Sequence, residues 1–396
     1  MNGQARQRWR YAPGECATRW AVPGDIVASQ PSERGGDERT RRGPESVLSR
    51  IWATCGAFEW VALGYLGCSS LLALLFARNL AHPARLVGTQ LSVAALLLTL
   101  CGIEARSAAR QAVQGTSFAS RWWHFWRHWY PHLFFLFCFE ELAGLMTLFT
   151  PRWQDDKLMA FDQWLTGVQP SVWLEPFSTL GRNEFLQLCY LSYFTYLLIL
   201  GGILYVRREW WAYWSVMTYS MVGYAIGYLV AMFFPIESPW FAMAGAWKAP
   251  LAGGPVTATV NFIEHFGRVR GAAFPSEHVA GAVAALWGVW RYRRWLLWVM
   301  LPVFFFMCIS TVWGRYHYVA DVLGGFLTGT LGYVLGSVLM KCPGAVRTAR
   351  IGISGRGGER ARFGRPDDRA VPLEVKGERD EQGLVIPRDQ KLQAHR

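Results

Sequence analysis

The chain has 396 residues, of which 52% are apolar and 15% aromatic, and only 17% carry a charge. Several apolar runs reach the roughly 20 residues that a helix needs to cross a bilayer, which excludes an ordinary soluble globular protein. Much of the net charge of +12 lies in two polar tails and in short loops, and no nucleic-acid-binding motif accompanies it. This distribution favours membrane topology and contact with anionic lipid over nucleic-acid binding.

Both ends of the chain are polar. Residues 1–46 are rich in Arg, Gly and Pro and lack the apolar core of a signal peptide, and residues 341–396 mix acidic and basic residues with many glycines. This composition predicts two disordered cytoplasmic tails. The eight cysteines include no CxxC pair and lie mostly in apolar runs, which favours packing over disulfides or a zinc site.

Apolar segments between the tails predict an all-α fold, a polytopic membrane bundle of about eight spans. Residues 47–130 would supply the first two spans and a cytoplasmic loop, and residues 131–340 the remaining core. The expected spans are residues 57–77, 86–103, 131–150, 185–206, 212–234, 275–290, 295–313 and 318–340.

Arginines predict the orientation of the bundle. They gather in the connections at 104–128, 207–208 and 291–294. With eight spans and a cytoplasmic N-terminus, these connections and both tails fall on the cytoplasmic side, as the positive-inside rule requires. The chain is therefore expected to be an integral membrane protein, and its arginine- and glycine-rich composition suggests a bacterial cell membrane.

The same count places the two longest connections, 151–184 and 235–274, on the outer face. Long connections without evident structure of their own are often functional. The stretch "FPSEH" (Phe274–His278) and the junction "RYH" (Arg315–His317) reach this face as well. We therefore expect the active site at the extracytoplasmic face.

The stretch "GRYHYVAD" contains a histidine and an aspartate four residues apart, His317 and Asp321. A carboxylate one helical turn away can hold one imidazole nitrogen as N–H and leave the other free as a nucleophile. Arg315 adds a planar guanidinium, which suits phosphate. A polar pair that only caps a span is the alternative, but a second histidine at the same face favours catalysis.

That second histidine lies in "PSEHVAG". Pro275 precedes an expected helix start, where Ser276 and the free backbone N–H groups of the first turn form an anion site. His278 follows closely enough to reach a leaving-group oxygen, so that it could act as an acid or base.

Together, "AAFPSEHVAG" and "STVWGRYHYVADVLGG" resemble the type-2 phosphatidic acid phosphatase superfamily, which also contains vanadium haloperoxidases and inositolphosphotransferases. Residues 275–278 match its motif Pro-Ser-x-His, and His317 and Asp321 match its His-x-x-x-Asp. The resemblance is specific over residues 235–340 and extends less firmly back to about residue 150.

The chain also departs from the family pattern. Glu277 stands where many members have Gly, and Ser310-Thr311 stands where they have Ser-Arg. We expect Arg315, one helical turn beyond Thr311, to supply the missing guanidinium. The first family motif is absent, and this makes the chain more similar to the branch related to inositolphosphotransferases.

The resemblance implies several further phosphate-site residues. Arg270 is the best candidate for a second phosphate cation, and Arg268 and Lys248 are weaker candidates. Asp162 lies in "AFDQWLTGVQP" (Ala160–Pro170), which resembles a region before the core of the inositolphosphotransferase-like branch, and it is a weaker site candidate too.

The activity that the resemblance implies is phosphoryl transfer without a metal or other cofactor. His317 would attack phosphorus to give a phosphohistidine, Asp321 would orient it, and His278 would protonate the leaving alcohol and then activate water or an acceptor alcohol. The phosphate-binding positions would be Arg315, Arg270, Ser276 and Glu277. The substrate would be a lipid phosphate with its apolar part in the bilayer.

Three other functions stay open. The chain could transfer a phospho-headgroup to an alcohol acceptor, as the inositolphosphotransferase-like branch does. It could be a non-catalytic transporter or scaffold, although its intact histidines and aspartate disfavour this. A haloperoxidase is the most remote alternative, because a pocket among membrane spans suits lipids better.

Other polar residues have simpler explanations. His124, His128 and His132 are spaced like metal ligands, but Pro131 is expected to break the helix there and the surrounding Trp and Tyr indicate an interfacial aromatic belt. We therefore predict no metal site.

Two acidic pairs and a glycine series remain. Glu140 and Glu141, inside a span, are expected to pair with an arginine or to line the headgroup pocket. Asp155 and Asp156 are expected in a solvated loop. The glycines of the last span, which predict close helix packing, are Gly325, Gly329, Gly332 and Gly336.

Overall fold

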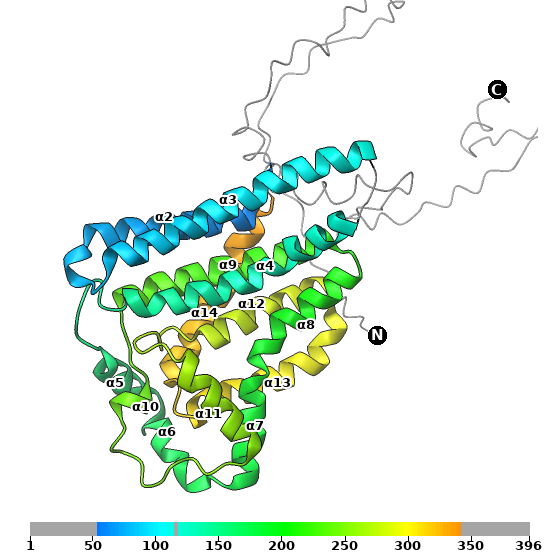
Figure 1. Ribbon diagram of the computed structural model, residues 1–396. Coiled ribbons are helices and arrows are strands. Elements are labelled where there is room, and N and C mark those ends of the chain that lie inside the picture. Colours follow the sequence, from blue (N-terminus) through cyan, green and yellow to red (C-terminus); the bar gives the residue numbers. More distant parts are fainter. Residues whose placement is uncertain (1–53, 115–117, 342–396) are drawn as a thin grey trace, which may run out of the picture. The chain divides into compact units, whose positions relative to one another are not determined.

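The computed structural model describes residues 54–114 and 118–341, and the two predicted tails lie outside this range, apart from Lys341. Within the described part, every regular element is a helix (Figure 1), apart from one isolated bridge between Ile236 and Ala272. The all-α fold class is thereby confirmed.

The longer helices form the bundle. They are α2 (Ala57–Leu75), α3 (Pro83–Gln114), α4 (Phe118–Leu142), α8 (Tyr193–Val206), α9 (Trp210–Phe233), α12 (Glu277–Tyr292), α13 (Leu297–Trp313) and α14 (Val319–Leu339). Shorter helices lie in the connections: α5 (Asp155–Thr166), α6 (Pro170–Trp173), α7 (Leu180–Leu191), α10 (Pro239–Ala242) and α11 (Pro255–Gly267). Single 3-10 turns are η2 (Ala77–Asn79), η3 (Ala143–Leu145), η4 (Glu175–Phe177) and η5 (Arg294–Leu296).

Five helices of the described part are long and apolar enough to cross a membrane, and α7 with α8, bent by 42°, would make a sixth. The predicted number of eight spans is not confirmed. One reason is that α12 has only 16 residues, about 24 Å at 1.5 Å per residue, against a hydrocarbon core of about 30 Å. Another is that the first half of α4 is rich in Trp, His and Arg.

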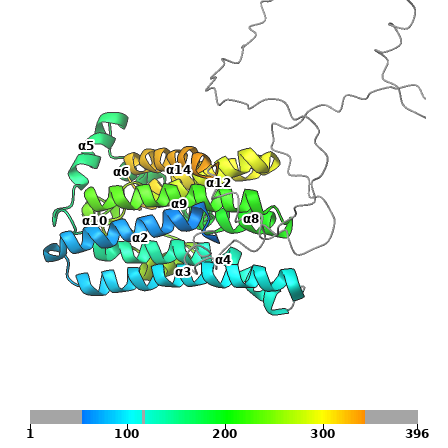
Figure 2. The ribbon, with the colours of Figure 1, turned by 90° about the horizontal axis from the view of Figure 1, so that it is seen from above.

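The centre of the bundle is α9, which packs against α2, α12 and α14 (Figures 1 and 2). The glycines of α14 make close contact with α12 possible, as predicted. A Cβ atom at Gly325 would lie 2.3 Å from the carbonyl oxygen of Ser276, so no larger residue fits there without a shift. The backbone N–H of Ser276 also donates to the carbonyl oxygen of Asp321, over 2.9 Å. The starts of α12 and α14 are therefore held together.

Several segments expected to be irregular are helical, and those expectations were wrong. In the connection at 104–128, residues 104–114 belong to α3 and residues 118–128 to α4, and α4 passes through Pro131. The outer connections contain helices α5, α6, α10 and α11. Signals for α5 are present in the sequence, because two aspartates stand in its first turn and Gly167 ends it with a left-handed φ of 77°.

Candidate active site

Two histidines from separate helix starts face each other. His278 lies in the first turn of α12 and His317 directly precedes α14, and Nδ1 of His278 lies 3.1 Å from Nε2 of His317. Nδ1 of His317 lies 3.0 Å from the carbonyl oxygen of Ala273, which can only accept. In neutral His317 the proton is therefore on Nδ1, and Nε2 has a free lone pair. That lone pair can accept a hydrogen bond from His278 only when Nδ1 of His278 also carries a proton, as it does when His278 is protonated on both ring nitrogens and can act as an acid.

Two carboxylates hold the start of α14 in place, and with it the neighbouring His317. Asp321 is fully buried, and its Oδ2 accepts the backbone N–H of Tyr318 at 2.7 Å and lies 3.3 Å from Nδ1 of His317. Asp162, from α5, accepts the N–H groups of Val319 and Ala320, each at 2.9 Å. Two acidic side chains thus cap the helix that follows the nucleophile. Asp162 is a positioning residue here and makes no contact with His317.

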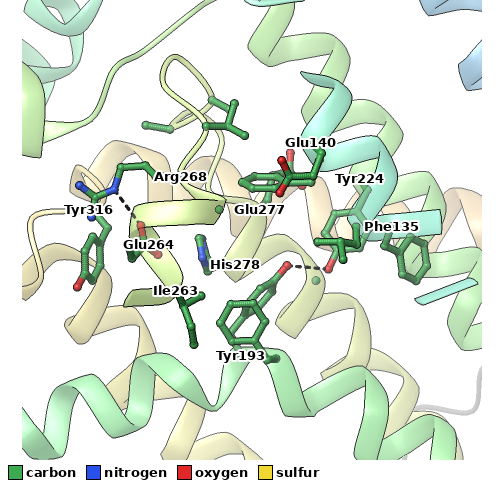
Figure 3. A pocket seen from close by; sticks show the side chains of 18 of the residues that line it. Phe135, Glu140, Tyr193, Tyr224, Ile263, Glu264, Arg268, Glu277, His278 and Tyr316 are labelled. Atoms are coloured by element: carbon green, nitrogen blue, oxygen red, sulfur yellow. Dashed lines mark hydrogen bonds and ion pairs between the residues drawn. The ribbon is translucent and has the colours of Figure 1, made fainter. Parts of the chain in front are cut away.

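A hydrogen-bonded chain continues from His278 on its other side. Nε2 of His278 lies 2.8 Å from the hydroxyl of Tyr190, which donates to Glu264. Glu264 in turn forms an ion pair with Arg268, which Figure 3 marks with a dashed line, over a distance of 2.9 Å. A proton on Nε2 of His278 would therefore be stabilised by a carboxylate through one intervening hydroxyl group.

A cavity of about 400 Å³ joins these groups. His278, Glu264 and Arg268 line its polar end (Figure 3), and His317 lines the cavity as well. From there it runs between α4, α8, α9 and α12, where its walls are mostly apolar and aromatic. This wall includes Phe135, Leu136, Phe139, Tyr193, Phe194, Leu197, Leu198, Tyr224 and Tyr228.

Of the three residues predicted as additional phosphate-binding cations, one lies in the cavity wall and two are exposed. Arg268, expected as a weaker candidate, lines the cavity and stacks over Trp240 with its guanidinium 4.6 Å from the ring centre. Arg270 is 59% exposed and pairs with Glu237. Lys248 is exposed, and its backbone N–H donates to Glu175. Among the arginines and lysines of the described residues, Arg268 alone lines the cavity.

Arg315 does not share a helical face with Thr311, and that expectation was wrong. Helix α13 ends at Trp313, and Arg315 has a left-handed φ of 68°, which turns the chain. Its guanidinium lies 3.5 Å from Glu175 and over Trp247, and it does not line the cavity. A phosphate-binding role for Arg315 would require this ion pair to open.

The side chains of the two middle residues of the Pro-Ser-x-His motif, Ser276 and Glu277, point in different directions. Ser276 is buried and caps α12, accepting the N–H of Val279 at 3.4 Å. Glu277, 3% exposed, turns its carboxylate into the cavity on the side of α9. A carboxylate repels phosphate, so in this arrangement only the backbone of Glu277 suits a phosphate-binding role.

The expectation that Asp155 lies in a solvated loop was wrong. Asp155 is buried instead of lying in a solvated loop, and it accepts the backbone N–H groups of Glu237 and Ser238 and the hydroxyl of Tyr318. Burial raises the pKa of Asp155 and likewise that of Asp162. Asp155 therefore joins α5 to the connection that carries Glu237.

Residues that the sequence analysis missed complete the site. Tyr190 and Glu264 stand in ordinary helical segments, and no sequence pattern marks them as partners of His278. Of the two acidic residues expected to pair with an arginine or to line a pocket, Glu140 lines the cavity. Glu141 instead accepts a hydrogen bond from the hydroxyl of Thr89 at 3.0 Å. His132 also lines the cavity.

Burial of His317 determines its protonation state and therefore how activity depends on pH. Loss of solvation lowers the pKa of His317 from 6.5 to about 4, so Nε2 keeps its lone pair at pH values where an exposed imidazole is already protonated. We expect the acidic limb of the kcat/KM profile for phosphate release near pH 4. An acidic limb near pH 6.5, measured between pH 3.5 and 8 in detergent, would contradict this assignment.

Residues 156–335 match the family model of the PAP2 superfamily, a range that contains His278, His317 and Asp321. No curated protein and no solved structure matches the chain. The match supports the type-2 phosphatidic acid phosphatase superfamily, whose members are usually phosphatases or phosphotransferases, and hence an enzyme. With the long apolar helices it also supports an integral membrane protein.

Proposed function

We propose that the protein is a membrane phosphatase or phosphotransferase that acts on lipid phosphates through a phosphohistidine. The observation that carries this proposal is the histidine pair, 3.1 Å apart, at the polar end of a cavity with apolar walls. The phosphate would lie at the histidines, and the apolar part of the lipid would occupy the rest of the cavity.

In the first step, the phosphate enters between the two rings. Nε2 of His317 attacks phosphorus and the bond to the ester oxygen breaks, while Nδ1 of His278 donates its proton to the leaving alcohol. Arg268 and the free N–H groups at the start of α12 stabilise the charge on the phosphate oxygens. In the second step, His278 takes a proton from water or from an acceptor alcohol, which attacks the phosphohistidine and regenerates His317.

The side wall of the cavity supports a lipid substrate. Leu136 on α4 and Phe194 and Leu198 on α8 line the cavity, yet they are 57%, 42% and 41% exposed. Apolar side chains that face both a cavity and the outside of a membrane bundle provide a route from the bilayer. In this proposal a lipid tail passes between the outer halves of α4 and α8.

A larger side chain at this route should therefore reduce activity on long-chain lipids. We expect Leu136→Trp to raise KM for a lipid phosphate with two long chains at least about fivefold and to change KM for a short-chain analogue little, because only the long tail needs the opening. Phosphate release from both substrates, compared in one detergent, measures this.

Leu133 offers a matched control. It lies one turn earlier on α4 and is 58% exposed, but it does not line the cavity. Leu133→Trp should leave both KM values unchanged. If Leu133→Trp and Leu136→Trp behaved alike, or if short and long chains were affected equally, the route between α4 and α8 would be refuted.

The proposed function is tested by phosphate release from purified protein with EDTA present. The panel comprises phosphatidate, phosphatidylglycerol phosphate and prenyl mono- and diphosphates, each with and without an added alcohol acceptor. We expect release or transfer that survives chelation with at least one substrate. Activity that requires added metal, or no reaction with any substrate and acceptor, would refute it.

A further inference from the structure

The proposed mechanism gives no role to the carboxyl group of Glu277, which lies in the cavity wall. It is 3% exposed and lines the cavity, and within the described residues neither of its oxygens has a hydrogen-bond partner. Leaving a buried carboxylate without partners is costly, so such a group implies a ligand or a function.

The neighbouring backbone makes room for this carboxylate. A Cβ atom at position 227 of α9 would lie 2.1 Å from Oε1 of Glu277, so Gly227 leaves the space that the side chain occupies. Glu277 is thus accommodated inside the bundle and is not turned toward the bilayer. The arrangement holds a buried carboxyl group on the residue directly before His278 in the chain.

Aromatic rings surround the same part of the cavity. Tyr193, Tyr224 and Tyr228 all line it and lie close enough to Glu277 for electrostatic interaction. Figure 3 marks the hydrogen bond between the hydroxyls of Tyr193 and Tyr224, which are 3.4 Å apart. The rings of Tyr224 and Tyr228 stack with their centres 5.8 Å apart. We call Glu277 with these three tyrosines the tyrosine–carboxylate chamber.

The charges on the cavity wall favour a cation in this chamber. The lining carboxylates are Glu140, Glu237, Glu264 and Glu277, against one guanidinium, that of Arg268. Within the described residues Glu264 and Glu237 form ion pairs with arginines, and Glu277 and Glu140 form none. Wherever the unpaired carboxyl groups are ionised, they would repel a phosphate ester that enters alone. A ligand that brings its own positive charge would offset this repulsion.

We propose that the tyrosine–carboxylate chamber binds a cationic amine carried by the phosphate-containing ligand, either a primary ammonium or a quaternary ammonium group. The carboxylate would neutralise the amine, and the tyrosine rings would contact it through their negative faces. This inference rests on the proposed function in so far as it places the phosphate at the histidines. It narrows the ligand to amine-bearing phosphate esters, from a zwitterionic lipid headgroup or from a soluble phospho-amine.

The test measures binding in the full-length His317→Ala protein, so that turnover does not interfere. The probes are dihexanoyl phosphatidylcholine and dihexanoyl phosphatidylglycerol, which have equal tails. We expect the choline lipid to bind at least tenfold more tightly, and Glu277→Gln to bring the ratio of affinities close to one. A ratio near one before the substitution, or a ratio unchanged by it, would overturn the proposal.

Two further variants keep the result interpretable. Glu141→Gln removes a carboxylate on α4 that contacts Thr89 and does not line the cavity, and it should preserve the ratio. Tyr193→Leu should lower the ratio, whereas Tyr193→Phe should keep it because the ring remains. If Tyr193→Leu left the preference intact, the chamber would be excluded even if Glu277→Gln did not fold.

Soluble phosphocholine, added as a competitor, distinguishes the two sources of the amine. Displacement of the lipid supports a soluble ligand, and lack of displacement supports a membrane lipid, with the amine subsite retained in both. The amine subsite and the proposed function are tested independently. If the wild-type protein showed no turnover, the proposed function would be refuted, but the measured binding preference for the choline lipid would remain.

Discussion

Replacing His317 with alanine is expected to lower kcat for phosphate release at least about a thousandfold, because the nitrogen that forms the bond to phosphorus is removed. The rest of the site would remain in place. Asp321 keeps the backbone N–H of Tyr318 as its donor, and Asp162 still caps α14. The loss should therefore appear in turnover while the substrate still binds.

The matched control is His82→Ala. His82 is exposed in the connection between α2 and α3, away from the cavity, and its loss should leave kcat unchanged. A trapping experiment with phosphate-labelled substrate adds an independent measurement. Label should become attached to the wild-type protein in an acid-labile form and should be absent from His317→Ala. Substantial turnover by His317→Ala would rule out a phosphohistidine on this residue.

Replacing Asp321 with asparagine should have a smaller but still large effect, a fall in kcat of about 100-fold with little change in KM. In a serine protease triad the equivalent change costs about 10⁴-fold, because the histidine adopts the wrong tautomer. Here the carbonyl oxygen of Ala273 also accepts from Nδ1 of His317, at 3.0 Å, and it would hold part of the population in the reactive tautomer. Loss of a supporting group typically costs 10- to 100-fold.

The tautomer can be observed directly. Nitrogen-15 spectra of labelled protein should show Nδ1 of His317 protonated in the wild type and a mixture of tautomers in Asp321→Asn. Asp156→Asn serves as the control, since Asp156 is an exposed neighbour of the buried Asp155. An Asp321→Asn protein with wild-type kcat would show that Ala273 alone orients the nucleophile.

The sequence predicted the reacting groups better than their surroundings. The i, i+4 spacing of His317 and Asp321 and the helix start at Ser276 are local features, and the structure shows both of them. That the two histidines meet at 3.1 Å depends on packing between α12 and α14. The glycines of α14 gave the only sequence signal for that contact.

The positions of the phosphate-binding arginines were harder to predict from the sequence. Arginine side chains are long, and a change in one backbone dihedral angle points them in another direction. Arg315 was expected on a helical face, but the left-handed turn after α13 aims it at Glu175. Tyr190 and Glu264 could not be predicted, since their roles depend on contacts between residues more than 70 positions apart. The eight predicted spans are not confirmed, because α12 is too short and the first half of α4 is too rich in polar residues to count as an independent span.

The contact of Gly325 with Ser276 has a consequence for how such an enzyme can diversify. It ties the two helix starts that carry the histidines into one unit, whereas the apolar route lies between other helices, α4 and α8. Substitutions along α4 and α8 can alter which tails are admitted without disturbing the spacing of the reacting nitrogens. Selection can therefore act on lipid preference and on chemistry as separable traits within one chain.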